Sequence, residues 1–276
     1  MPLTQIIILA AVQGITEFLP ISSSGHLILV PKLGGLADQG LMMDVAVHVG
    51  TLLAVMLYFW RDMIGMTRAL GRSLGLMSNR RNLDNEFRLF FKLVLATLPV
   101  IVAGFFVNKY MGADLRTLEI IGWATLGFGV VLYIADKMNM TVRQIEHISF
   151  GGAFFIGLMQ IVALVPGTSR AGITMSAARF LGVERRDAAR FSLLLSIPTI
   201  IGAGALKGYE LYKLDDPVLL DDAMSVAGLA FVFALISISL LMVWLRRASF
   251  TPFVIYRILL GGALVYVAYY APDFTF

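Results

Sequence analysis

Hydrophobic residues are gathered along this chain into long continuous runs, and most polar residues lie between them. A helix of about 20 residues crosses the roughly 30 Å hydrocarbon core of a bilayer. Six runs are apolar over enough positions to span as helices, namely 42–60, 89–107, 118–135, 191–206, 226–244 and 253–270. The run 191–206 is the shortest and contains Pro198. The pattern predicts an all-α polytopic membrane protein with six full transmembrane helices.

Two further apolar stretches, 3–36 and 150–181, are interrupted near their centres by short polar segments. The first interruption reads Pro-Ile-Ser-Ser-Ser-Gly-His at 20–26, and the second reads Pro-Gly-Thr-Ser-Arg-Ala-Gly at 166–172. Neither half of either stretch is long enough to cross a bilayer alone. We therefore expect two re-entrant broken-helix hairpins, each entering and leaving the membrane on one face.

Composition supports a bilayer as the solvent and narrows the possible partners. Apolar residues make up 58% of the chain and charged residues 14%, whereas a typical soluble domain has about 25% charged residues. The absence of cysteine excludes a disulfide framework and a thiolate metal site. A net charge of +4 is explained by basic loops beside membrane helices, so we do not expect nucleic acid as a partner.

The distribution of lysine and arginine predicts how the helices are threaded. The segment 61–92 contains seven basic residues, which favours a cytoplasmic location. If the six spans then alternate, 16 of the 22 basic residues lie inside. This alternation requires the first hairpin to enter from the outer face and the second from the inner face. We therefore predict a single transmembrane domain, 1–276, built as an inverted-topology repeat of about 1–135 and 150–270.

The two polar tips are suited to binding an anion. Non-helical backbone at membrane depth must line a polar cavity or be buried in protein, because lipid cannot satisfy its N–H groups. Each tip opens a new half-helix, whose free N–H groups and positive dipole end favour negative charge. Arg170 adds a planar, permanently charged group suited to phosphate oxygens, and in an apolar stretch it requires an anionic partner. That partner is either a ligand or Glu17.

Glu17 lies four residues after Gln13 and therefore shares a helical face with it. A carboxylate and an amide oxygen one turn apart can hold a hard divalent cation such as Mg²⁺ or Ca²⁺, which can bridge phosphate oxygens. A structural alternative is that Glu17 and Arg170 form a buried ion pair that only joins the hairpins. His26, three residues after Ser23, can act as general base, nucleophile or proton donor, or be a structural imidazole.

The segments that carry these residues resemble the signatures of a known family, the undecaprenyl-diphosphate phosphatases, also called bacitracin-resistance proteins. The sequence Gln-Gly-Ile-Thr-Glu-Phe-Leu-Pro-Ile-Ser-Ser-Ser-Gly-His at 13–26 is similar to the first signature. The sequence Pro-Gly-Thr-Ser-Arg-Ala-Gly-Ile-Thr at 166–174 resembles the second, in which a serine usually occupies the position of Ala171. The likeness runs through the whole chain.

The resemblance implies hydrolysis of a polyprenyl diphosphate lipid, undecaprenyl diphosphate, to its monophosphate. This reaction recycles the lipid carrier of peptidoglycan synthesis and gives bacitracin resistance. The resemblance also implies a multi-pass protein of the bacterial inner membrane, an active site open to the outer side and a divalent cation requirement. A homodimer is one possible assembly.

The expected catalytic residues are Glu17, Ser23, His26 and Arg170, with Gln13 and Glu17 as cation ligands. We favour Ser23 for in-line attack on the terminal phosphorus, although the sequence equally allows His26 or a cation-bound water. Substrate contacts are expected from the remaining tip residues Ser22, Ser24, Gly25, Gly167, Thr168, Ser169 and Thr174. The competing hypothesis is a lipid-phosphate transporter or flippase, because transporters also use inverted re-entrant repeats. The fold alone cannot choose between the two functions.

Overall fold

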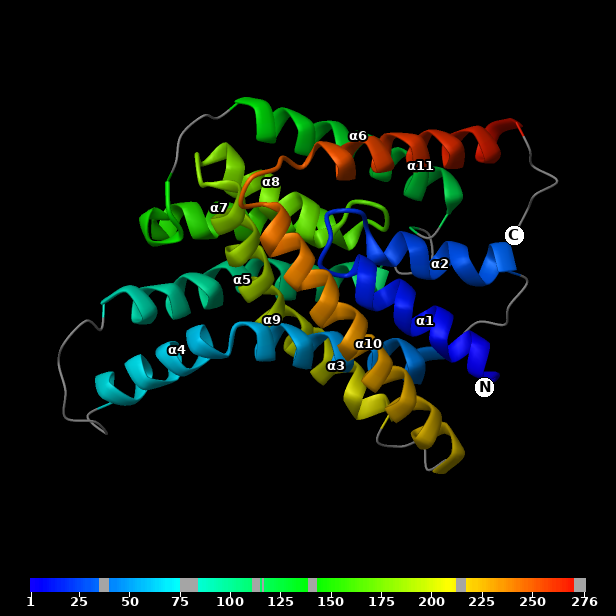
Figure 1. The fold of residues 1–276 in the computed structure, drawn as a ribbon, viewed down its shortest axis with the longest axis horizontal. Coiled ribbons are helices and arrows are strands. Elements are labelled where there is room, and N and C mark those ends of the chain that lie inside the picture. Colours follow the sequence, from blue (N-terminus) through cyan, green and yellow to red (C-terminus); the bar gives the residue numbers. More distant parts are fainter. Residues whose placement is uncertain are drawn as a thin grey trace.

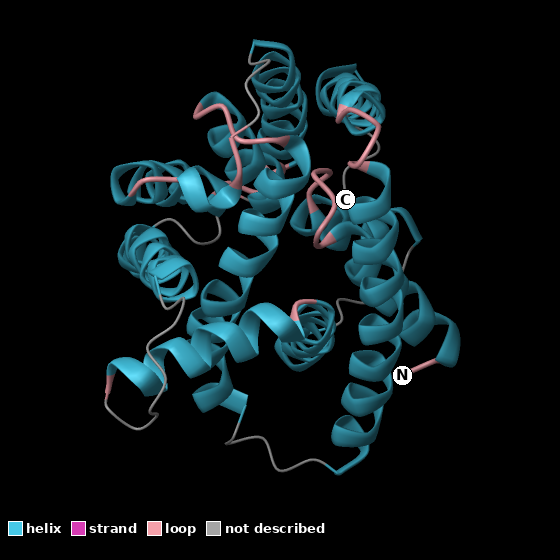
Figure 2. Ribbon diagram, turned by 60° about the vertical axis from the view of Figure 1, so that its left-hand side comes forward, coloured by secondary structure: helices cyan, strands magenta, loops and turns pink. Residues whose placement is uncertain are grey.

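The computed structural model describes residues 1–34, 40–74, 84–110, 115, 117–138, 143–211 and 217–270. In chain order the elements are α1 (Leu3–Thr16), α2 (Ser23–Gly34), α3 (Gly40–Tyr58), α4 (Trp60–Ser73), α5 (Asp84–Tyr110), α6 (Leu118–Met138), η1 (Ile145–His147), α7 (Phe150–Ile161), η2 (Val162–Leu164), α8 (Arg170–Phe180), α9 (Arg185–Leu211), α10 (Pro217–Trp244) and α11 (Thr251–Tyr270). The parts drawn in colour in Figure 2 are helices and loops without a strand. The predicted all-α class is confirmed.

Within these ranges, four helices are long and apolar enough to cross a bilayer. They are α5 over Asn85–Val107, α6 over Leu118–Met138, α10 over Leu220–Trp244 and α11 over Thr251–Tyr270. The pair α3 and α4 provides a fifth candidate, although the two helices meet at 78°. The chain is therefore a multi-pass helical membrane protein with four to five candidate spans, fewer than the six that the sequence predicts.

The predicted span that is not among these candidates is the run 191–206, which lies inside α9. This helix begins with the charged residues Arg185 and Arg186 and carries the buried hydroxyls of Ser192 and Ser196. It packs against α3, α5 and α8 in the interior of the bundle. A helix enclosed by protein on several sides does not need the continuous apolar surface that lipid requires, so α9 can carry these polar groups.

The helix predicted over 42–60 ends two residues early, at Tyr58, because the chain bends sharply after α3. Phe59 separates the two helices, and α4 then presents a buried apolar face that includes Met66 and Ala69. Arg61 and Arg68 lie exposed on its opposite side. Such an amphipathic helix with basic residues on its polar face is suited to the surface of a membrane.

Long helices pack in pairs that are far apart in the sequence. Helices α6 and α11 run side by side at the top of Figure 1, while α10 packs against both α3 and α1. Two glycines permit the closest approaches: a Cβ on Gly50 would lie 2.1 Å from the carbonyl oxygen of Ala227, and one on Gly157 would lie 2.4 Å from that of Ala96. Small residues at helix contacts are typical of packing in membranes.

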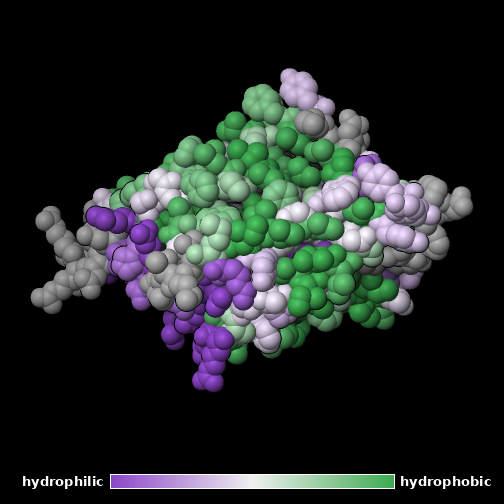
Figure 3. All heavy atoms as spheres, turned by 90° about the horizontal axis from the view of Figure 1, so that it is seen from above, coloured by the Kyte–Doolittle hydropathy of each residue, from purple (hydrophilic) through white to green (hydrophobic). Residues whose placement is uncertain are grey.

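The molecular surface is apolar over much of its area. Figure 3 shows hydrophobic residues across the middle of one face, with hydrophilic residues gathered toward one end. Large exposed hydrophobic side chains belong to several helices, among them Leu98, Phe105, Ile236, Leu240 and Leu259. This distribution matches a protein whose outer surface contacts lipid tails.

Both expected interruptions are present as breaks between helices, α1 to α2 and η2 to α8. At the end of each break a serine adopts the left-handed backbone conformation, with φ of 74° at Ser22 and 69° at Ser169. Each serine Oγ then accepts a hydrogen bond from the glycine N–H three residues later, Gly25 at 3.4 Å and Gly172 at 3.1 Å. The same serine cap therefore starts the second helix of each hairpin.

Candidate active site

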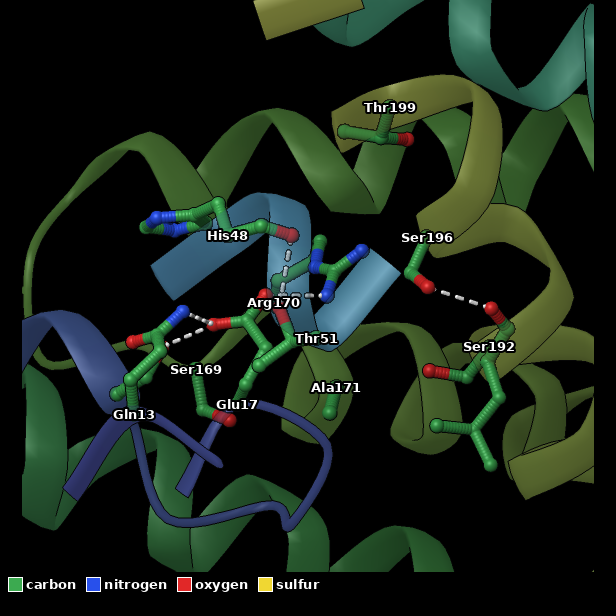
Figure 4. Close-up of polar contacts among 12 residues, drawn as sticks. Gln13, Glu17, His48, Thr51, Ser169, Arg170, Ala171, Ser192, Ser196 and Thr199 are labelled. Carbon is green, nitrogen blue, oxygen red and sulfur yellow. Dashed lines mark hydrogen bonds and ion pairs between the residues drawn. The ribbon is translucent and has the colours of Figure 1, made fainter. Parts of the chain in front are cut away.

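Glu17 joins the two hairpins through its carboxylate. It follows α1 directly and is 7% exposed. Its Oε2 accepts hydrogen bonds from Gln13 Nε2 at 3.0 Å and from Ser23 Oγ at 2.6 Å. Its Oε1 accepts a hydrogen bond from Arg170 Nη2 at 2.7 Å, which is also an ion pair (Figure 4). The predicted neighbours Gln13, Glu17, Ser23 and Arg170 are thus brought together.

The ion pair with Glu17 satisfies only part of the hydrogen-bonding capacity of the Arg170 guanidinium. It is the first residue of α8, directly after the left-handed Ser169. Its Nη1 is buried and has no hydrogen-bond partner within the described structure. The same holds for Oε1 of Gln13 and for Oγ1 of Thr168. Because a buried polar atom without a partner is costly, these three atoms around Glu17 and Arg170 indicate where a polar ligand can bind.

His26 lies in the first hairpin but is turned toward α11. Its Nδ1 is 2.7 Å from the carbonyl oxygen of Ser22, and its Nε2 is 2.5 Å from the hydroxyl of Tyr256. Since the carbonyl can only accept, Nδ1 carries the proton, and in the neutral ring Nε2 accepts from Tyr256. The two rings are also nearly parallel, with centroids 5.7 Å apart. Both ring nitrogens are therefore engaged, and neither is hydrogen-bonded to Ser23.

The expected substrate contacts divide into two groups. Ser24 is exposed at the first tip, and its Oγ lies 3.3 Å from that of Ser22. Thr174 instead points into the core, where its hydroxyl lies 2.6 Å from Ser192 Oγ and donates to the carbonyl of Arg170. Thr174 is 1% exposed and hydrogen-bonded to protein, so the structure does not direct it toward the Glu17 cluster.

A buried arginine on α11 holds the two tips together. Arg257 is fully buried and donates from Nη1 to the carbonyl oxygen of Pro20 at 3.3 Å and from Nη2 to that of Gly167 at 3.0 Å. It also donates to the carbonyl oxygens of Ala124 and Thr125 in α6. The carbonyl of Gly167 is thus held by α11, and its φ of 95° suits glycine. Its contact with substrate stays a prediction.

Comparison with known proteins identifies the family to which this chain belongs. The family model described as bacitracin resistance protein BacA matches residues 6–263. The chain belongs to the BacA family. Proteins called undecaprenyl-diphosphatase from Ruegeria sp. (strain TM1040) and Roseobacter denitrificans are 49% and 48% identical to it, each covering 98% of this chain and 100% of the relative. Undecaprenyl-diphosphatase 1 from Rhodospirillum rubrum is 46% identical, covering 99% of this chain and 98% of the relative.

A divalent cation does not fit the side chains of this BacA-family site without further ligands. Within the described ranges, no three His, Asp or Glu side chains converge on one point. Both oxygens of Glu17 are already engaged, and the guanidinium of Arg170 lies 2.7 Å from one of them. Mg²⁺ and Ca²⁺ take about six to eight oxygen ligands, whereas the protein offers only Glu17 and the amide oxygen of Gln13. The cation stays a prediction.

Two residues that contact the hairpin tips, Tyr256 and Arg257, are absent from the sequence prediction. Both lie in the apolar run 253–270. An arginine within a membrane span is itself a signal, because such a charge is costly unless protein groups satisfy it. That signal identifies Arg257 as unusual, but only the folded chain shows that its partners are the two hairpin tips.

Proposed function

We propose that this BacA-family protein hydrolyses undecaprenyl diphosphate to undecaprenyl phosphate and inorganic phosphate. The observation that carries the proposal is the 2.6 Å hydrogen bond from Ser23 Oγ to the Glu17 carboxylate, beside an Arg170 with an unpaired N–H. A hydroxyl activated by an adjacent base is the arrangement of a nucleophilic enzyme. A transporter does not require this pair, and the three relatives named above are all called diphosphatases.

The reaction can be written with these side chains alone. Ser23 Oγ attacks the terminal phosphorus while Glu17 accepts the hydroxyl proton, and the bond from that phosphorus to the bridging oxygen breaks. The departing prenyl phosphate takes the proton from Glu17. A water then attacks the phosphoserine, Glu17 accepts a proton from this water, and the proton returns to Ser23 as phosphate leaves.

Positive charge at the two tips stabilises the phosphoryl group. Arg170 supplies a charged N–H, and the N-termini of α2 and α8 supply partial positive charge directly after Ser22 and Ser169. Preorganised donors of this kind are often the largest contribution to catalysis. In this mechanism Glu17 is the base for Ser23, and His26 holds the first tip against α11. A divalent cation is expected to be bound mainly by the diphosphate.

The proposed topology has six spans and two re-entrant hairpins, arranged as an inverted repeat. This proposal is supported by the matching construction of the two tips. The capping serines, Ser22 and Ser169, are 147 residues apart. Gln13 and Gln160 are also 147 residues apart, and each lies nine residues before its capping serine. The packing also has matching parts, since α1 contacts α10, α7 contacts α5, and α6 contacts α11. With the segment 61–92 in the cytoplasm, the protein lies in the bacterial inner membrane with its site open to the outer side.

Thiol labelling of intact cells tests this orientation. The chain has no cysteine, so Ser24→Cys introduces one reporter at the exposed first tip, and Ser73→Cys introduces one at the end of α4. A membrane-impermeant thiol reagent should label the first variant from outside, and prenyl diphosphate should slow that labelling. The second should react only after the cells are opened. Labelling of position 73 but not 24 in intact cells contradicts the proposed orientation.

Phosphate release by the purified protein tests the function itself. In detergent, the parental protein should release inorganic phosphate from undecaprenyl diphosphate, and Ser23→Ala should abolish that release. Ser239→Ala, which removes a hydroxyl that donates to the carbonyl of Leu235 within α10, is the matched control and should keep most of the activity. A folded parental protein that binds the lipid but releases no phosphate favours the transporter hypothesis instead.

A further inference from the structure

Arg257 occupies an unusual place for a charged residue. It lies in the first half of α11, a candidate membrane span, and is completely buried. Within the described part of the chain it forms no ion pair with a carboxylate. Burying a guanidinium is expensive unless its N–H groups are satisfied. Here four backbone carbonyl oxygens satisfy them, at distances of 3.0 to 3.4 Å.

Two of these carbonyls occupy matching positions in the two hairpins. Pro20 lies three residues before Ser23, and Gly167 lies three residues before Arg170. The guanidinium of Arg257 therefore holds each tip at a carbonyl three residues before a side chain of the site, Ser23 in one tip and Arg170 in the other. The other two carbonyls belong to α6, which packs along the whole of α11 in Figure 1. Arg257 thus connects both tips to the rigid α6 and α11 pair.

Room for the guanidinium is provided by Gly172 in the first turn of α8. A Cβ at this position would lie 2.8 Å from Nη1 of Arg257, closer than side-chain atoms normally approach. The second hairpin is therefore built around the guanidinium. Because Arg257 is fully buried and its N–H groups are taken by backbone carbonyls, it is placed to act on the tips and not on a ligand.

We propose that Arg257 is a positioning residue for the hydrolysis, holding Ser23 of the first tip and Arg170 of the second in register through the carbonyls of Pro20 and Gly167. The inference rests on the proposed function. Attack by Ser23 needs the phosphorus in line, and Arg170 fixes where the phosphoryl oxygens lie. Because the two residues belong to different hairpins, their alignment depends on the contact between the tips.

The expected loss of turnover follows from how strongly a reaction rate depends on the alignment of the reacting groups. A displacement of 1 Å in a reacting group can cost about 100-fold in rate. Arg257→Met keeps the length and packing of the side chain but removes all four carbonyl contacts, so we expect kcat to fall about 100-fold. KM should change by less than about threefold, because the residue does not touch the substrate.

The experiment compares Arg257→Met, Arg257→Lys and Arg179→Met with the parental protein, using undecaprenyl diphosphate in detergent micelles. Lysine keeps the charge but cannot reach the four carbonyls, so it should restore no more than about a tenth of kcat. Arg179 is the control, a buried arginine at the other end of α8 that donates to the carbonyls of Val183 and Asp136 and pairs with the Asp136 carboxylate. Arg179→Met should lower the unfolding temperature but leave kcat per folded molecule within about threefold.

Folded protein is measured by thermal unfolding of each variant, so that loss of fold is separated from loss of rate. If Arg257→Met does not fold, Gly172→Ala places a Cβ 2.8 Å from Nη1 of Arg257, perturbs the same guanidinium and should also lower kcat. The inference is overturned if Arg257→Met keeps its kcat, if lysine restores full turnover, or if KM rises as far as kcat falls. A folded parental protein that releases no phosphate overturns the proposed function and this inference together.

Discussion

Glu17→Gln changes one carboxylate to an amide of nearly the same size at the centre of the cluster. The carboxylate accepts hydrogen bonds from three donors, Gln13 Nε2, Ser23 Oγ and Arg170 Nη2. An amide has a single acceptor oxygen, and its NH₂ group must face at least one of these donors. The substitution therefore removes the proposed base and also leaves Arg170 without its anionic partner.

Both consequences have an expected magnitude. Loss of a positioned general base typically lowers turnover about 100- to 10,000-fold. Breaking a buried ion pair by removing one partner costs about 3–5 kcal/mol, and the lower end applies here because the Arg170 side chain is 17% exposed. We therefore expect Glu17→Gln to lose at least about 100-fold in turnover and to be less stable by about 3 kcal/mol.

Initial rates of phosphate release and thermal unfolding in detergent measure the two effects separately. Glu119→Gln is the control, because Glu119 is an exposed carboxylate at the start of α6, far from Glu17 along the chain and bonded to Tyr269. It should hydrolyse at the parental rate. Glu17→Asp keeps the charge but is one methylene shorter, so it should be intermediate. A folded Glu17→Gln protein that works within about threefold of the parental rate would refute the role of Glu17 as the base.

Three further substitutions test other parts of the site. Arg170→Lys keeps the charge but loses the planar fork, so phosphate release should stay at least about tenfold below parental; full activity would mean that charge alone matters. Gly167→Ala should unfold at a lower temperature, because its φ of 95° is strained for alanine and its Cβ would lie 2.4 Å from a carbonyl oxygen. Gly127→Ala, with no atom within 4 Å of its Cβ, should not. His26→Ala should lower turnover by about 100-fold, because it releases the first tip from α11 and displaces Ser23. His48 lies in α3 with its Nδ1 2.6 Å from the carbonyl oxygen of Asp44, and His48→Ala should leave turnover unchanged; equal effects would remove His26 from the site.

The local parts of this protein could be predicted from its sequence. Apolar runs of membrane length identify helices regardless of what they pack against, because lipid imposes the same requirement on each of them. The two breaks were visible as Pro, Gly and hydroxyl residues within apolar stretches. The spacing of Gln13 and Glu17 placed them on one helical face, since the period of a helix is a local property.

Contacts that hold the two hairpins together depended on the tertiary structure, because they join residues 90 or more positions apart. Arg170 reaches Glu17, and Arg257 reaches Pro20 and Gly167, only after α8 and α11 have packed beside the first hairpin. An arginine in an apolar stretch and its candidate partners can be read from a sequence, but helix packing decides which of those partners it contacts. Packing likewise encloses α9 within the bundle. It also places Tyr256 of α11 beside His26, so the imidazole bonds to Tyr256 and not to Ser23, because buried polar groups take the hydrogen-bond partners that the folded chain provides.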